Sequence, residues 1–145
     1  MTINDEIRLQ LANIPNAPII IDDWEPVADL LSEMFDWAGS KIDWRKTTEH
    51  KYLELGEDKE RWPYVVKVFI CNYTHGFIYN SNEIYYLNDS SLDFALKISP
   101  NQINSMLDLL IEQVPQHHYF FNPDTKWCLV ISSEGYVDFG LSKDR

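Results

Sequence analysis

Four carboxylates recur at helical spacing near the start of the chain: Glu25, Asp29, Glu33 and Asp36. At about 100° per residue they fall within an arc of about 80° on one side of a helix. The stretch from Asp22 to Ser40 contains no Lys or Arg. Like charges at this spacing destabilise a helix slightly, whereas opposite charges stabilise it. The row therefore lowers local stability, and the chemistry it offers is the electrostatic attraction of a cationic partner.

The charge of the whole chain supports the same interpretation. Its 145 residues carry a net charge of −11, and residues 1–60 hold 14 Asp and Glu against 6 Lys and Arg. Binding nucleic acid or an anionic membrane needs clustered Lys and Arg, so the composition argues against both. The composition favours, as the binding partner, another protein that has a basic surface. The residues predicted to contact that partner are Asp22, Asp23, Glu25, Asp29, Glu33, Asp36, Asp43, Trp44, Glu54, Glu57 and Asp58.

Tryptophan offers a second kind of binding group. Trp44 and Trp62 flank the acidic stretch 43–60, where an exposed indole beside carboxylates suits the centre of a protein interface. Trp37 and Trp127 lie in apolar patterns and are expected in the core.

The histidines give no metal-binding or catalytic pattern. His117 and His118 are adjacent, so on a strand they point to opposite faces, and His50 and His75 have no Cys or His at a ligand spacing. The chain also lacks a G-x-S-x-G elbow, a P-loop and a G-x-G-x-x-G loop. We therefore expect no metal, no cofactor and no enzymatic activity.

Cys71 and Cys128 each lie in an apolar run, which predicts buried free thiols, with a disulfide between them left open. Two cysteines do not make the disulfide framework of a small secreted protein. The acidic N-terminus lacks the basic and apolar regions of a signal peptide. No stretch approaches the roughly 20 apolar residues of a membrane-spanning helix. We expect a reduced, cytoplasmic protein.

Helices are expected to position the acidic front of the chain. Apolar residues at helical spacing predict a helix over 3–13, capped by Asn4 or Asp5, and a second helix from about 24 to 38. Gly39 suits the position after the end of this second helix. Within residues 40–61, only the segment KYLELGEDKER, residues 51–61, predicts a local structure, a helical turn ended by Gly56 and then a charged loop.

Strands are expected from residue 64 onward. The β-branched and aromatic residues of 64–73 predict one strand, and 76–80 with 83–88 predict a hairpin. Residues 92–98 alternate, with the even-numbered apolar side chains on one side. Ser99-Pro100-Asn101-Gln102 is a capping box that begins a helix over about 100–114.

Three C-terminal strands separated by short turns predict a β-meander. The whole chain, residues 1–145, is therefore predicted to be a single α+β domain. Its N-terminal helices pack on a mainly antiparallel sheet, and one helix (about 100–114) lies between strand groups.

The segment YFFNPDTKWCLVISSEGYVDFG, residues 119–140, resembles the terminal meander of small bacterial immunity proteins. These include the immunity proteins of contact-dependent growth inhibition and other polymorphic toxin systems. The resemblance implies a cytoplasmic antitoxin that binds and neutralises a cognate toxin. Many such toxins are nucleases with basic grooves, which an acidic face occludes by imitating phosphate charge. Immunity interfaces differ between toxins, so the contact residues named above come from the charge pattern alone.

Two alternatives stay open. A regulatory or scaffold module that binds a host protein would present the same acidic face. A small carboxylate-dependent hydrolase would need two acids converging in a cleft, with a raised pKa on one of them.

Overall fold

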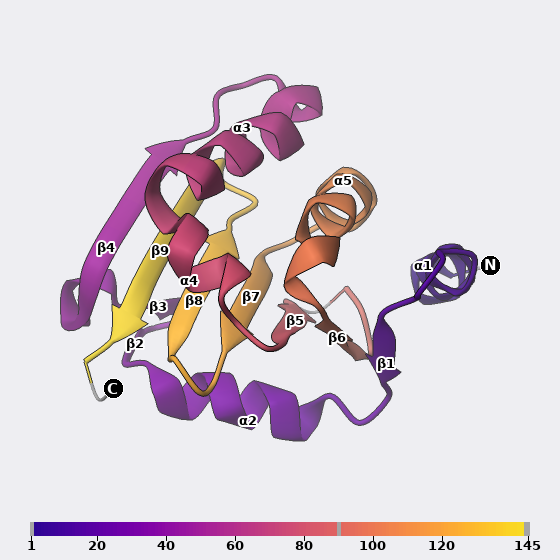
Figure 1. Ribbon diagram of the computed structural model, residues 1–145, viewed down its shortest axis with the longest axis horizontal. Coiled ribbons are helices and arrows are strands. Elements are labelled where there is room, and N and C mark those ends of the chain that lie inside the picture. Colours follow the sequence, from indigo (N-terminus) through magenta and orange to yellow (C-terminus); the bar gives the residue numbers. More distant parts are fainter. Residues whose placement is uncertain (1, 90, 144–145) are drawn as a thin grey trace.

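Within residues 2–89 and 91–143, which the computed structural model describes, seven antiparallel strands form one sheet (Figure 1). The strand order is β1-β6-β5-β7-β8-β9-β4. The strands are β1 (Ile19–Ile21), β4 (Thr47–Glu54), β5 (Ile84–Asn88), β6 (Ala95–Ile98), β7 (His118–Asn122), β8 (Trp127–Ile131) and β9 (Tyr136–Ser142). A separate hairpin pairs β2 (Trp37–Ala38) with β3 (Lys41–Ile42). The predicted α+β fold with a mainly antiparallel sheet is confirmed.

Helices cover both faces of this sheet (Figure 1). The longer helices are α1 (Ile3–Ala12), α2 (Glu25–Met34), α3 (Trp62–Phe69), α4 (His75–Tyr79) and α5 (Ile103–Gln113). A π-helical turn, η3 (Ile70–Thr74), joins α3 to α4, and short 3₁₀ turns are η1 (Trp44–Lys46), η2 (Lys59–Arg61) and η4 (Pro100–Gln102). Helices α3, α4 and α5 pack on one face, whereas α2 and the β2–β3 hairpin pack on the other. No described helix is long and apolar enough to span a bilayer.

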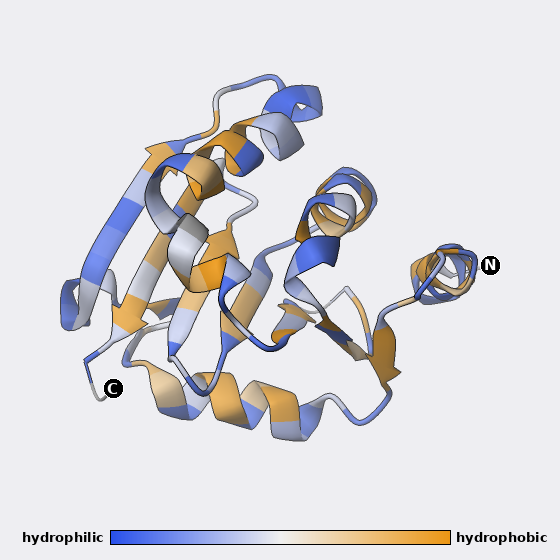
Figure 2. Ribbon diagram, viewed as in Figure 1, coloured by the Kyte–Doolittle hydropathy of each residue, from blue (hydrophilic) through white to orange (hydrophobic). Residues whose placement is uncertain are grey.

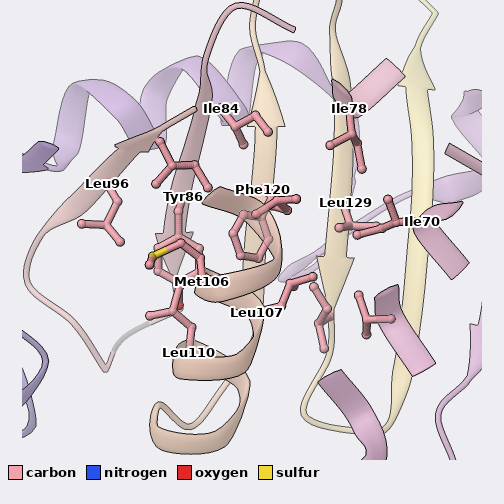
Figure 3. Packing of buried hydrophobic residues seen from close by; sticks show 14 of the residues in the cluster. Ile70, Ile78, Ile84, Tyr86, Leu96, Met106, Leu107, Leu110, Phe120 and Leu129 are labelled. Atoms are coloured by element: carbon pink, nitrogen blue, oxygen red, sulfur yellow. The ribbon is translucent and has the colours of Figure 1, made fainter. Parts of the chain in front are cut away.

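Successive side chains of a strand point to opposite faces of the sheet, so the buried side chains form two separate cores, one on each face. Phe120 faces α5, whereas its neighbours Tyr119 and Phe121 face α2. In the larger core, Met106 of α5 lies against Tyr86 and Phe120 of the sheet (Figure 3). Figure 2 shows hydrophobic residues on the central strands and hydrophilic residues along most of β4. Strand β4 lies at the edge of the sheet and is largely exposed.

Helix α2 ends earlier than predicted. Its last residue is Met34, and Phe35 adopts an extended conformation with its side chain buried in the smaller core. The chain then turns at Gly39, which has a positive φ, so that Trp37 pairs with Ile42. The prediction of a helix through residue 38 is wrong, because burying Phe35 and pairing the hairpin outweigh the helical pattern.

Residues 47–54 form an edge strand, so the prediction of a helical turn there is wrong. Their side chains are mostly polar and exposed, and therefore leave no apolar period in the sequence. Pairing with β9 determines their conformation.

Residues 62–79 are helical, so the predicted strand at 64–73 and the first strand of the hairpin, 76–80, are wrong. The second strand of that hairpin, 83–88, is observed as β5. Pro63 begins α3, and the buried residues Trp62, Val66 and Phe69 are spaced four and three apart. This spacing places them on one helical face toward the sheet. Core packing therefore outweighs the β-propensity of the valines.

Other local predictions are confirmed. Helices α1 and α5, the meander β7–β8–β9 and the alternation of residues 92–98 lie where expected. The capping box at Ser99 and Gln102 is present, although a 3₁₀ turn precedes α5. The expected cap of α1 is wrong, since Thr2 is the N-cap and Asp5 completes its capping box.

Chemical labelling of thiols should distinguish the two cysteines by their solvent exposure. Cys71 is exposed, so its predicted burial is wrong, whereas Cys128 is buried and neither forms a disulfide. Desolvation, with a smaller contribution from Asp138, raises the pKa of the Cys128 thiol. We expect Ellman's reagent to modify Cys71 rapidly in the native protein and Cys128 only in denaturant. Rapid modification in a native Cys71→Ser variant would contradict the buried position of Cys128.

Candidate protein-binding site at helix α2

Helix α2 presents three carboxylates to solvent on the side away from the sheet. Val27, Leu31 and Met34 are buried, whereas the α2 row (Glu25, Asp29 and Glu33) is exposed. Among the described residues, no Lys, Arg or His forms an ion pair with this row. No cation in the described part of the chain therefore compensates the charge of this row, and Glu25 also lies at the helix N-terminus, where the helix dipole favours a carboxylate.

Three other predicted contact residues lie beside α2. Asp22 precedes the helix and forms an ion pair with Arg8 of α1 at 2.8 Å. Asp23 is exposed just before the helix. Asp36 is exposed beyond the helix end, so it lies next to the α2 row without belonging to it.

Asp43, one of the predicted contact residues, stabilises the local fold. Its side chain is buried and accepts hydrogen bonds from the Arg45 backbone N–H at 3.2 Å and from the Arg45 guanidinium at 3.0 Å. These hydrogen bonds hold the pKa of Asp43 below its usual value. The predicted contact residue Trp44 is half-buried, and its ring stacks on His50 with a centroid distance of 4.9 Å.

The remaining predicted contact residues lie far from α2. Glu54 ends β4, and Glu57 and Asp58 follow in the turn before η2, at the opposite end of the molecule (Figure 1). The Asp58 side chain accepts a hydrogen bond from the Glu60 backbone N–H at 3.1 Å and so caps η2. The predicted set therefore does not form one surface, and only its α2 part is contiguous.

A cleft of about 530 Å³ opens between α2 and residues 87–89 and 91–94, in a region where no local sequence pattern predicts a site. Trp24, Ala28 and Leu31 line its α2 side. Trp37 and Tyr119 form part of its floor, with ring centroids 6.1 Å apart. The cleft volume is typical of ligand pockets, which measure about 300–1,000 Å³. It arises from contact between segments about 60 residues apart, which no local pattern reveals.

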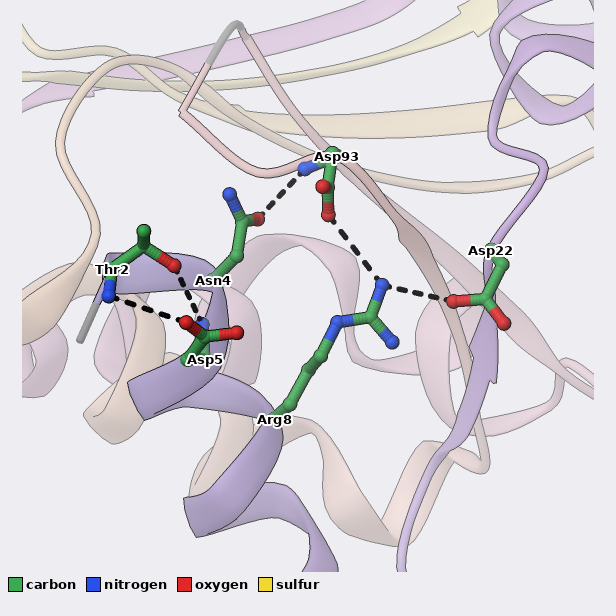
Figure 4. A network of polar contacts seen from close by, with 6 residues as sticks. All are labelled: Thr2, Asn4, Asp5, Arg8, Asp22 and Asp93. Atoms are coloured by element: carbon green, nitrogen blue, oxygen red, sulfur yellow. Dashed lines mark hydrogen bonds and ion pairs between the residues drawn. The ribbon is translucent and has the colours of Figure 1, made fainter.

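Helix α1 fixes the wall of the cleft opposite α2 (Figure 4). The Asn4 side chain accepts a hydrogen bond from the Asp93 backbone N–H at 2.8 Å, and Arg8 contacts the Asp93 carboxylate at 3.4 Å. The Arg8 guanidinium also lies 4.4 Å from the centre of the Phe94 ring. These contacts hold Asp93 and Phe94 in place, so the cleft exists before any ligand binds.

A second polar cluster lies at the β4 end of the sheet. His50 Nε2 is 2.8 Å from Asp138 Oδ1. Burial raises the pKa of Asp138, although the hydrogen bond to His50 opposes the shift. Glu134 lines the same small cleft as Asp138, and its hydrogen bond with Lys41 lowers its pKa. Two acids thus share a cleft and the pKa of one of them is raised, which is the arrangement that a carboxylate-dependent hydrolase would require. A basic side chain contacts each acid, His50 at Asp138 and Lys41 at Glu134.

Comparison with known proteins adds no relationship. The chain matches no protein-family model and no curated protein.

Proposed function

We propose that this protein binds a basic protein through the α2 row and neutralises it, as an immunity protein acting on a cognate toxin in the cytoplasm. The observation that carries the proposal is an exposed row of three carboxylates without ion pairs in the described part of the chain. The resemblance of residues 119–140 to immunity proteins supports a toxin as the partner. A nuclease toxin is favoured because its substrate groove must attract phosphate.

The α2 row suits rapid capture of such a partner. Its carboxylates lie on a rigid helix, whose buried face is held by Val27 and Leu31. A one-signed surface attracts an oppositely charged partner over roughly 10 Å at 0.1 M ionic strength. Such steering raises the association rate, and charge pairs formed on contact slow dissociation.

Reversing charge on the α2 row should weaken binding to the proposed toxin, for which the product of the adjacent upstream open reading frame is the candidate to test. For the Asp29→Lys/Glu33→Lys variant we expect an affinity loss of about 100-fold at low salt, since two attractive pairs become repulsive. The affinity should also depend less on salt. Titration calorimetry at two salt concentrations measures both effects, and co-expression with the toxin measures loss of growth rescue.

A matched variant controls for net charge. Glu54→Lys/Glu57→Lys makes the same charge change at the far end of the molecule, and we expect an affinity change of less than about 3-fold. Thermal unfolding should show that both variants fold. Equal affinity loss in the two variants would reject the α2 row as the interface. Absence of binding and growth rescue by the unaltered protein would reject the toxin as its partner and favour a regulatory module.

A further inference from the structure

We propose that the cleft between α2 and residues 87–89 and 91–94 receives an aromatic side chain from a basic segment of the partner. This inference rests on the proposed function and names the chemistry of the partner's contact segment. The cleft and the α2 row then form one binding site with an apolar centre and an acidic border.

The α2 row borders the cleft on the helix surface. Ala28 and Ser32 line the cleft, and Glu25 and Asp29 each precede one of them by three residues. Residues three apart are neighbours on a helix surface. Glu25 and Asp29 are therefore neighbours of cleft-lining residues on the helix surface, although they do not line the cleft themselves.

The opposite border is also negative. Asp89 and Asp93 line the cleft and are exposed. The Asp93 carboxylate contacts Arg8, whereas none of the described cations forms an ion pair with Asp89. A ligand seated in the cleft thus has acidic groups on both sides, so it meets attraction only where it carries positive charge.

The interior of the cleft selects an apolar group. Trp37, Phe94 and Tyr119 supply aromatic walls, and Trp24 contributes an indole that is 41% exposed. The Trp37 indole N–H donates to the Ser32 carbonyl oxygen at 3.3 Å, which directs the ring edge toward α2. Aromatic rings attract one another beyond the gain from area burial alone. An aromatic side chain flanked by Lys or Arg matches both the interior and the border.

Synthetic peptides test the two parts of the site separately. The probes are acetyl-KKWKK-amide, acetyl-KKSKK-amide and acetyl-EEWEE-amide, titrated into ¹⁵N-labelled protein and followed by NMR. We expect the KKWKK peptide to bind about ten-fold more tightly than KKSKK, because its indole becomes buried. Signals of the Trp24 and Trp37 indole N–H groups should shift. The EEWEE peptide should not bind.

Two variants distinguish failure of the cleft from failure of the acidic row. Ala28→Phe fills the cleft and should abolish the ten-fold preference for KKWKK while leaving the affinity for KKSKK unchanged. Asp29→Lys/Glu33→Lys should weaken both peptides and leave their ratio unchanged. Trp24→Ala removes an exposed wall and should reduce the preference even if Ala28→Phe fails to fold.

Equal affinity of the unaltered protein for KKWKK and KKSKK would overturn the inference. The proposed function would survive if the charge-reversed variant still bound both peptides more weakly. Equal binding of EEWEE and KKWKK would overturn the basic character of the occupant. Retention of the ten-fold preference in a folded Ala28→Phe variant would show that the indole binds elsewhere.

Discussion

Phe120→Ala should lower the free energy of unfolding by about 3–5 kcal/mol, the usual loss for a large aromatic residue in a close-packed core. Phe120 lies on β7 at the centre of the sheet order and is fully buried. Its ring centroid is 4.9 Å from that of Tyr86 on β5, and its register partner on β8 is Leu129. Helix α5 covers it (Figure 3), so the cavity cannot close by a local shift. Urea unfolding at pH 7 measures the loss.

The edge strand offers a matched control for this substitution. Tyr52 of β4 also lies on the sheet, but its side chain is 66% exposed. Tyr52→Ala should change the free energy of unfolding by less than about 0.5 kcal/mol. Similar losses for the two variants would contradict the placement of the main core between α5 and the central strands.

His118 should make the protein less stable as the pH falls from about 6.5 to about 4. Burial, with a smaller contribution from His117, lowers the pKa of His118 from 6.5 to about 4. In this interval the unfolded chain binds a proton at His118 and the folded protein does not, so acid favours unfolding. A difference of about 2.5 pKa units corresponds to about 3 kcal/mol. Above pH 6.5 neither state is protonated at His118, and its effect disappears.

The Tyr86 hydroxyl is a hydrogen-bond partner of the His118 imidazole inside the core. Its oxygen lies 2.7 Å from His118 Nδ1, and burial raises the pKa of this hydroxyl far above neutral. Because a hydroxyl can either donate to a ring nitrogen or accept from a ring N–H, it can hydrogen-bond the neutral imidazole in both of its tautomers.

His118→Gln should remove this pH dependence while keeping an acceptor for Tyr86. Unfolding free energies of both proteins at pH 7, 5.5 and 4.5 test the prediction. The exposed carboxylates titrate in both proteins, so the difference between the two curves reports His118 alone. Parallel curves would show that His118 is protonated equally in the folded and unfolded states.

In the proposed complex, charge and shape would have separate roles. The α2 row would attract a basic partner at a distance and so raise the rate of encounter. The cleft would act only on contact and lengthen the residence time, because an inserted side chain must leave before the complex separates. Residues outside a central apolar anchor then mainly exclude water from it.

Local patterns alone were sufficient wherever neighbouring residues determine a conformation. The alternation of residues 92–98, the capping box at Ser99 and the short turns of the C-terminal meander each predict the observed element. The acidic character of α2 was equally readable, because charge and helical spacing are properties of the sequence itself.

Only the tertiary structure decided the features that depend on contacts between distant segments. The Val-rich stretch after Pro63 becomes helical because its buried residues meet the sheet on one face. Residues 47–54 form a strand because they hydrogen-bond to the edge of β9. Helix α2 ends at Met34 because the Phe35 side chain packs into the smaller core. The cleft exists because α1 holds Asp93 opposite α2. Each of these outcomes depends on the free energy of packing against a distant segment. Most residues prefer one backbone conformation over another by only about 0.5 kcal/mol, and packing outweighs this preference.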